Sequence, residues 1–170
     1  MIHKIGLGGG CHWCTEAVFQ SLKGVEKVEQ GYVSSVEEDA FSEAVIVHFN
    51  PDSIPLKVLI EVHLYTHKST SNHSMRTKYR SGVYVFSKFQ ALTVEAIIDK
   101  FQYNFEKPLV TKVYTFKRFK ASRSALLDYY NKNPKKPFCK TYINPKLKLL
   151  LDQFSEFVRV QRDAQIKVLE

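Results

Sequence analysis

Two cysteines separated by two residues stand near the start of the chain, in the stretch GLGGGCHWCTEAVFQSL. The pair Cys11 and Cys14 suits three kinds of chemistry: half of a zinc site, a dithiol that exchanges disulfides, or a nucleophile with a second thiol that resolves its oxidised form. His12 and Trp13 lie between the thiols, and three glycines precede them. The CxxC motif alone does not distinguish these three kinds of chemistry, so other residues of the chain are needed to choose among them.

The glycine run predicts a tight turn between a strand at residues 3–7 and a helix over residues 12–22. Cys11 then lies at or near the N-cap of that helix. Unpaired backbone N–H groups and the positive end of the helix dipole favour a thiolate there, so we expect the pKa of Cys11 to be lowered. Cys14 follows one turn later on the same helical face, within reach of Cys11 for a disulfide.

The elements that must hold this helix follow in short alternating units without a repeat. Apolar periodicity and turn residues predict strands at 25–33, 41–49, 82–86 and 109–116, and helices at 55–65, 88–105, 122–133 and 146–168. The polar stretch 66–78 is expected to be a loop. Such alternation is typical of one α+β or α/β domain.

Composition limits the class of protein. The chain has 170 residues, 44% of them hydrophobic, which suits one domain with a sizeable core. No apolar run approaches the ~20 residues of a membrane span, and the start has no signal-peptide pattern. With only three cysteines, these features predict a cytoplasmic protein. The net charge of +8 is spread along the chain, so we expect a solvated basic surface and neither nucleic acid nor a membrane as partner.

Two alternative functions use the same cysteines. A zinc-binding module would add His63 and His67, four residues apart, to Cys11 and Cys14. The stretch of chain between Cys14 and His63 is much longer than the spacing in zinc fingers, and a domain of this size needs no metal to fold. A general thioredoxin-like thiol–disulfide oxidoreductase also carries CxxC at a helix N-terminus.

Four collinear motifs resemble one known family. The stretch GGGCHWCTEAVFQSLKGVEKVEQGY resembles the opening GGCFWxxEAVFxxLxGVxxxxxGY of the type A peptide methionine sulfoxide reductases, or MsrA family. Later family motifs resemble SEAVIVHFNPDSIPLKVLIEVHLYTH, TKYRSGVYVFSKFQ and NKNPKKPFCKTYINPKLKLL, in the same order. Together they span nearly the whole chain, and a thioredoxin-like protein has no use for the last three.

The resemblance implies an oxidoreductase of protein repair under oxidative stress. Such an enzyme reduces the S-epimer of methionine sulfoxide, free or in proteins, to methionine. The Cys11 thiolate attacks the sulfoxide sulfur while an acid protonates the oxygen, which leaves a cysteine sulfenic acid. A second thiol condenses with it, and a dithiol donor of the thioredoxin type reduces the disulfide. No cofactor or metal is implied, and we expect a monomer.

The resemblance also implies roles for residues beyond the nucleophile. Trp13 matches an aromatic residue that packs against the substrate methyl group, and Tyr79 matches a tyrosine that hydrogen-bonds the substrate oxygen. Tyr129 matches a second tyrosine of the active site. Glu43 matches the acid. Strand alternation alone would turn Glu43 outward, whereas the role as acid predicts a buried carboxyl with a raised pKa that keeps its proton near neutrality.

The chain departs from the family pattern at several points. His12 replaces the usual phenylalanine, and two roles stay open for it, stacking on the methyl group or tuning Cys11. The loops before Glu43 and after His67 are altered. Residues 149–170 contain no cysteine, so Cys14 is favoured over Cys139 as the resolving thiol.

The resemblance and the element pattern together predict a single α+β domain over residues 1–170. We expect a ferredoxin-like α/β sandwich with a mixed sheet, a nucleophile at a helix N-terminus, and the C-terminal helix, about 146–168, packed on it.

Overall fold

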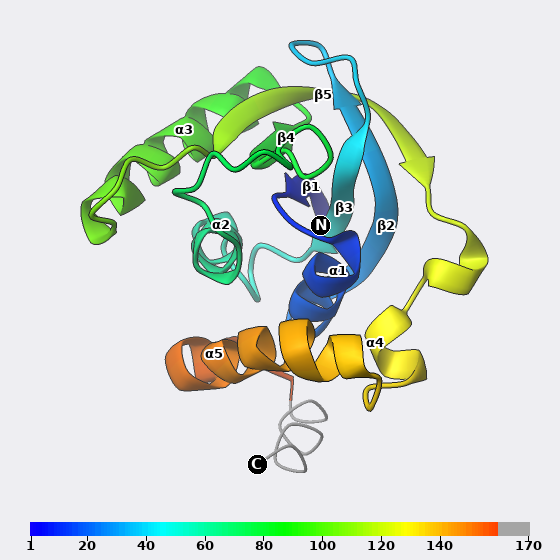
Figure 1. Ribbon diagram of the computed structural model, residues 1–170. Coiled ribbons are helices and arrows are strands. Elements are labelled where there is room, and N and C mark those ends of the chain that lie inside the picture. Colours follow the sequence, from blue (N-terminus) through cyan, green and yellow to red (C-terminus); the bar gives the residue numbers. More distant parts are fainter. Residues whose placement is uncertain (160–170) are drawn as a thin grey trace.

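A computed structural model describes residues 1–159 of the chain. Five strands form one mixed sheet, in which only β4 and β5 run parallel. The strands are β1 (His3–Gly8), β2 (Val25–Ser35), β3 (Ser42–Phe49), β4 (Gly82–Val85) and β5 (Lys112–Ala121). Their order is β1-β3-β2-β5-β4, and β4 also pairs with β1, so the sheet closes into a barrel (Figure 1).

Closure depends on the long strand β2. Its residues from Val25 to Val33 pair with β3, and those from Gly31 to Ser35 pair with β5, with a register shift in each ladder. A Cβ atom at Gly31 would lie 2.2 Å from the Lys120 carbonyl oxygen. Glycine is therefore needed where β2 passes from one partner to the other.

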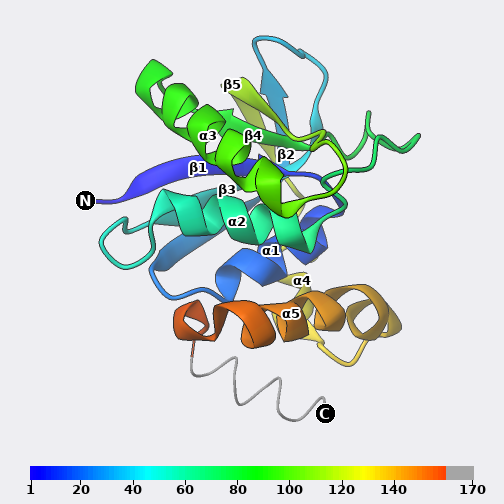
Figure 2. The same ribbon diagram turned by 90° about the vertical axis from the view of Figure 1, so that its left-hand side faces the viewer.

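Helices pack around this sheet and position the cysteine segment. They are α1 (His12–Gln20), α2 (Leu56–Thr66), α3 (Lys88–Phe101), α4 (Tyr129–Lys132) and α5 (Asn144–Phe154). Helices α2 and α3 lie side by side, and α1 lies between the sheet and α5 (Figure 2). The main core lies between the sheet and these helices, and it includes Leu7, Val18, Val47, Leu59 and Leu150. None of the described helices is both long and apolar enough to cross a membrane.

The structure confirms the α+β class, the mixed sheet and the nucleophile at a helix N-terminus. It differs from an open sandwich in that its sheet closes, because β2 and β5 are long enough to bend and pair on both sides. The last strand begins and ends later than the predicted range 109–116. The predicted helix 122–133 is replaced by a 3-10 turn at Ser124–Leu126 and the short α4. Asp128 adopts a left-handed conformation, φ 54°, which a continuous helix does not allow.

The C-terminal helix is shorter than expected within the described residues. Helix α5 ends at Phe154, a 3-10 turn covers Ser155–Phe157, and Val158 forms an isolated bridge with Leu22. The predicted portion from residue 160 to 168 lies outside the described residues.

Candidate active site

Cys11 occupies the N-cap of α1, as the glycine run predicts. Its carbonyl oxygen accepts hydrogen bonds from the backbone N–H groups of Cys14 and Thr15, at 3.1 and 3.2 Å. The chain reaches this position through Gly9, where a Cβ atom would meet the His67 ring at 2.4 Å. The glycine therefore allows α2 to pack closely under the start of α1, while the Cys11 thiol stays half-buried and accessible.

The two thiols of the CxxC motif are held in unequal states. A hydrogen bond from the Cys14 thiol is the main cause that lowers the pKa of Cys11 from 9.0 to about 7, and the backbone N–H of Trp13 adds to the effect against the opposing influence of burial. The same hydrogen bond and burial raise the pKa of Cys14. Cys14 is buried, with 6% of its surface exposed. At neutral pH Cys11 is therefore the more readily ionised thiol of the pair, and Cys14 keeps its proton.

Glu43 reaches the same point from β3, but its ionisation differs from the prediction. The side chain is buried, 5% exposed, rather than turned outward. Burial raises its pKa, but the His12 imidazole, the His12 backbone N–H and Lys78 lower it more, so the net shift of the Glu43 pKa is downward. The predicted rise in the Glu43 pKa is wrong. The prediction did not include the contact with His12, the basic residue that stands where the family pattern has phenylalanine.

The contact between His12 and Glu43 is short. Nδ1 of His12 lies 2.6 Å from Oε1 of Glu43, and the His12 backbone N–H donates to the same oxygen at 3.2 Å. Nε2 of the ring lies 3.1 Å from Oγ of Ser122. The ring is therefore held on both sides, and it lies 5.3 Å from the Tyr32 ring. The Lys78 ammonium lies 3.6 Å from Oε2 of Glu43.

A pocket of about 390 Å³ opens over these groups. Most of the predicted site residues line it, together with residues that the sequence analysis did not select. Its lining comprises Cys11, His12, Trp13, Tyr32, Phe41, Glu43, Lys78, Tyr79, Leu126 and Phe138. The thiol, the carboxylate and two tyrosine rings thus face one cavity, with aromatic walls suited to an apolar methyl group.

Tyr129 lies behind this pocket and is not among the described residues that line it. Its ring stacks on Trp13 with centroids 4.1 Å apart and planes 3° apart. Phe138 meets both rings edge-on. Tyr129 therefore covers one face of the tryptophan and fixes its orientation.

Tyr32 is the clearest site residue that sequence reasoning missed. The signal was present, since Gly31 and Tyr32 are the Gly-Tyr pair that closes the opening motif. Gly31 is explained by the close approach of β5. Tyr32 is the next residue of β2, and its side chain lines the pocket.

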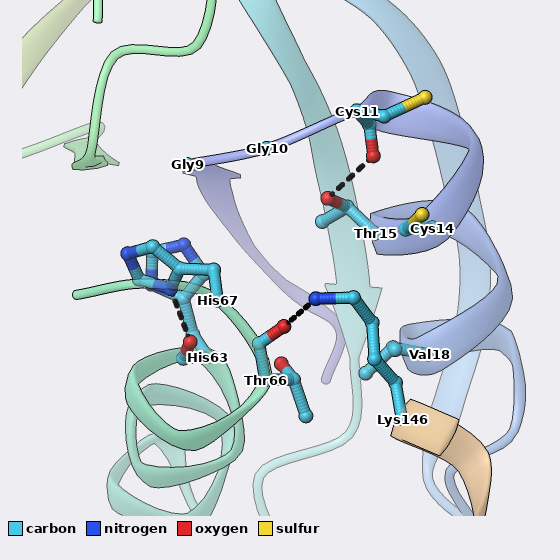
Figure 3. A pocket seen from close by; sticks show the side chains of 10 residues that line it. All are labelled: Gly9, Gly10, Cys11, Cys14, Thr15, Val18, His63, Thr66, His67 and Lys146. Atoms are coloured by element: carbon cyan, nitrogen blue, oxygen red, sulfur yellow. Dashed lines mark hydrogen bonds between the residues drawn. The ribbon is translucent and has the colours of Figure 1, made fainter. Parts of the chain in front are cut away.

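A second, smaller cavity of about 40 Å³ lies on the other side of the cysteine segment, between α1, α2 and α5 (Figure 3). His63 and His67 lie at its edge, with Nε2 of His63 bonded to the Gly8 carbonyl at 2.8 Å and Nε2 of His67 bonded to Ser81 Oγ at 2.8 Å. Burial lowers the pKa of His63 to about 4. Burial also lowers the pKa of His67. These rings are neutral structural groups that support the glycine turn.

The zinc-binding alternative with Cys11, Cys14, His63 and His67 is therefore wrong in its ligand set. Among the described residues, the group whose donor atoms come together is a different one, Cys11, His12 and Glu43. In Figure 3 the histidine rings and the two sulfur atoms lie on opposite sides of the cavity.

Cys139 is fully buried in the segment before α5. Its thiol donates to the Asn133 carbonyl at 3.5 Å, and burial raises its pKa. It lines neither of the two cavities. Of the other two cysteines, Cys14 is therefore the one that lies beside Cys11.

This geometry is typical of a thiol-dependent oxidoreductase, with a thiol at a helix N-terminus and a second thiol one turn later. The family model described as Peptide methionine sulfoxide reductase matches residues 3–157, and the chain belongs to that family. The Peptide methionine sulfoxide reductase MsrA of Psychrobacter sp. (strain PRwf-1) is 34% identical over 174 residues, which cover 92% of this chain and 99% of that protein.

Solved structures agree on the fold. Reduced Mxr1 from Saccharomyces cerevisiae matches with a TM-score of 0.74 at 23% identity, over 83% of this chain and 91% of that one. Mxr1 in complex with Trx2 matches with a TM-score of 0.61 at 22% identity, over 72% and 81% of the two chains.

Proposed function

We propose that this protein reduces methionine S-sulfoxide to methionine through Cys11 and is regenerated by thioredoxin. The observation that carries the proposal is the pocket geometry, in which Cys11 at the N-cap of α1 faces Glu43; the lowered pKa of Cys11 agrees with it. The Cys11 thiolate attacks the sulfoxide sulfur. The oxygen passes to Cys11 with one added proton, so that methionine and a cysteine sulfenic acid are the products.

The added proton comes from the contact between His12 and Glu43. The pKa of Glu43 is lowered, with burial opposing and His12 the largest lowering cause, and Nδ1 of the His12 ring lies 2.6 Å from the carboxylate. We assign the pair Glu43 and His12, rather than the carboxyl alone, as the acid. His12 also contributes to the lowered pKa of Cys11, less than the Cys14 thiol and the Trp13 N–H do, and tuning Cys11 is the second of the two roles left open for it.

The pocket walls supply recognition. Trp13, held by Tyr129, offers an aromatic surface to the methyl group, and Tyr79 offers a hydroxyl to the sulfoxide oxygen. Tyr32 lines the same cavity and supplies a second hydroxyl. The pocket is open to solvent, which suits methionine sulfoxide either free or on an exposed protein segment.

The resolving thiol is Cys14. It lies one helical turn from Cys11 and lines the same small cavity, so its sulfur can approach the sulfenic acid, displace the hydroxyl group as water and form the disulfide. Cys14 shares two cavities with Cys11, whereas Cys139 is buried against the Asn133 carbonyl and lines neither of them. A thioredoxin dithiol then reduces the disulfide by exchange. The Mxr1 structure solved with Trx2 supports a thioredoxin as the donor.

This chemistry needs no prosthetic group, because the electrons come from the donor dithiol. A reducing compartment such as the cytoplasm keeps the three free cysteines and the donor in the thiol state. We further propose that the enzyme acts as a monomer.

The decisive assay compares S- and R-methionine sulfoxide with thioredoxin as the donor. We expect turnover with the S-epimer and none with the R-epimer. Cys11→Ser should abolish reduction. Cys14→Ser should release a single equivalent of methionine per enzyme and then stop, whereas the control Cys139→Ser should turn over normally. Continued turnover of Cys14→Ser together with its loss in Cys139→Ser would assign the resolving role to the other cysteine.

A further inference from the structure

Three different donor groups meet in the pocket. Cys11 contributes a thiol, His12 contributes Nδ1 of its ring, and Glu43 contributes a carboxylate oxygen. These three atoms all lie within 4.8 Å of one another. Thiolate, imidazole and carboxylate are the ligands that Zn²⁺ takes in proteins, and the ligand atoms of one tetrahedral zinc ion are about 3–4 Å apart. Small side-chain rotations therefore suffice to bring all three onto one ion.

The imidazole is oriented for this role. Its Nε2 atom is 3.1 Å from Ser122 Oγ, and a histidine that binds a metal usually has its other ring nitrogen hydrogen-bonded in this way. Its Nδ1 atom is buried and lies 2.6 Å from Glu43 Oε1, but the contact lacks the angle of a directed hydrogen bond. Nδ1 is thus a buried nitrogen without a well-formed hydrogen bond, next to two further donors.

The surroundings leave a fourth position open. The three donors line the cavity of about 390 Å³, and Cys11 is half-buried, so a water molecule has space to complete the coordination. Three protein ligands with an open position are typical of accessible zinc sites rather than structural ones. Lys78 lies 3.6 Å from the other carboxylate oxygen of Glu43, and its side chain is 57% exposed, so it does not close the open position.

We propose that the reduced protein binds one Zn²⁺ ion through Cys11, His12 and Glu43, and that the ion blocks the nucleophile reversibly. The ion is an inhibitor and takes no part in the reaction. Binding itself is independent of the proposed function, and only the inhibition rests on it. The site depends on His12, the histidine that replaces phenylalanine of the family pattern. A relative with phenylalanine there lacks one of the three ligands.

The experiment measures zinc binding to the reduced protein without substrate or thiol donor, by competition with a zinc-sensitive dye. Binding of Co²⁺ as a probe adds a thiolate-to-metal absorption band that reports the Cys11 bond. We expect one ion per chain. Cys11→Ser, His12→Phe and Glu43→Gln should each weaken binding at least tenfold, on the scale of lost zinc-site interactions. The controls Cys14→Ser and His63→Gln should bind as the wild type does.

Each outcome decides the proposal. Undiminished binding in His12→Phe or Glu43→Gln, or loss of binding in Cys14→Ser or His63→Gln, would overturn this ligand set, as would absence of binding at micromolar zinc. Ser122→Ala keeps all three ligands and should weaken binding by about 10-fold or more through the lost support of the ring. Wild-type activity measured with a chelator, and again with zinc, tests the enzyme separately, so failure of the metal site is distinguishable from failure of the proposed function.

Discussion

The hydrogen bond from the Cys14 thiol to Cys11 can be removed without changing much else. Replacing Cys14 by alanine deletes the donor and leaves the helix N-terminus intact, because alanine is a strong helix former. The pKa of Cys11, about 7 with the donor present, should then move toward its ordinary value of 9.0. Cys14→Ser keeps an O–H that donates to the thiolate, so it should hold the pKa of Cys11 near the wild-type value.

The size of the effect follows from the fraction of thiolate. At neutral pH a thiol with a pKa near 7 is about half ionised, while a pKa of 9 leaves about 1% as thiolate. A rise in the pKa of Cys11 by one to two units therefore lowers its reactivity at neutral pH by about 5-fold to about 50-fold. The reactivity of Cys11 grows as the pH rises through its pKa, because more of the thiol is ionised. The alanine variant should therefore regain its reactivity at alkaline pH.

The assay is the rate of alkylation of Cys11 by iodoacetamide across the pH range, with thiolate absorbance in the ultraviolet as a second measure. Cys139→Ser is the matched control, since that buried thiol should neither react nor change the profile. The reasoning is refuted if Cys14→Ala titrates with the wild-type midpoint. It is also refuted if the serine and alanine variants shift equally, because burial rather than the hydrogen bond would then set the pKa.

Other perturbations test the site and the fold. Glu43→Gln should keep much of the reductase activity and Glu43→Ala should lose most of it, as measured by methionine release; equal activity of the alanine variant and the wild type would remove the carboxylate from the mechanism. Gly31→Ala should destabilise the fold by several kcal/mol in urea unfolding, because its Cβ would meet the Lys120 carbonyl at 2.2 Å; a change below ~0.5 kcal/mol would contradict this. Tyr129→Leu should raise KM for the sulfoxide, because the stacked support of the pocket tryptophan is lost; an unchanged KM would argue against that support. Buried His63, with its pKa lowered to about 4, favours the fold while neutral, so the unfolding free energy should fall by up to ~3 kcal/mol as the pH drops from about 6.5 to about 4; His63→Gln should flatten that slope, and an unchanged slope would show that other groups set it.

Local signals predicted the part of the site that lies within one segment. Glycines before a CxxC pair place Cys11 at a helix start, and this position and the direction of its pKa shift are confirmed. The prediction named the helix dipole as the cause. The structure adds the Cys14 thiol as the main one. Such a contact depends on side-chain rotation, which residue spacing does not specify.

Contacts between distant segments were harder to predict. His12 and Glu43 are far apart in the sequence, and only strand pairing brings β3 next to the start of α1, so the pairing that lowers the Glu43 pKa was not visible from residue types. The break at Asp128 has a similar origin, since the backbone N–H groups of Asp128 and Tyr129 donate to the Glu16 carboxylate. That buried acceptor holds the chain in a turn where local propensity favours a helix.

The closed ring of strands has a consequence for what the protein can recognise. Each of the five described strands has a partner strand on both sides for part of its length, so no strand leaves a whole edge free for an extended peptide to add as a further strand. This closure favours recognition of a single side chain in the pocket over recognition of an extended backbone. Recognition of this kind depends little on the residues that flank the side chain in the pocket.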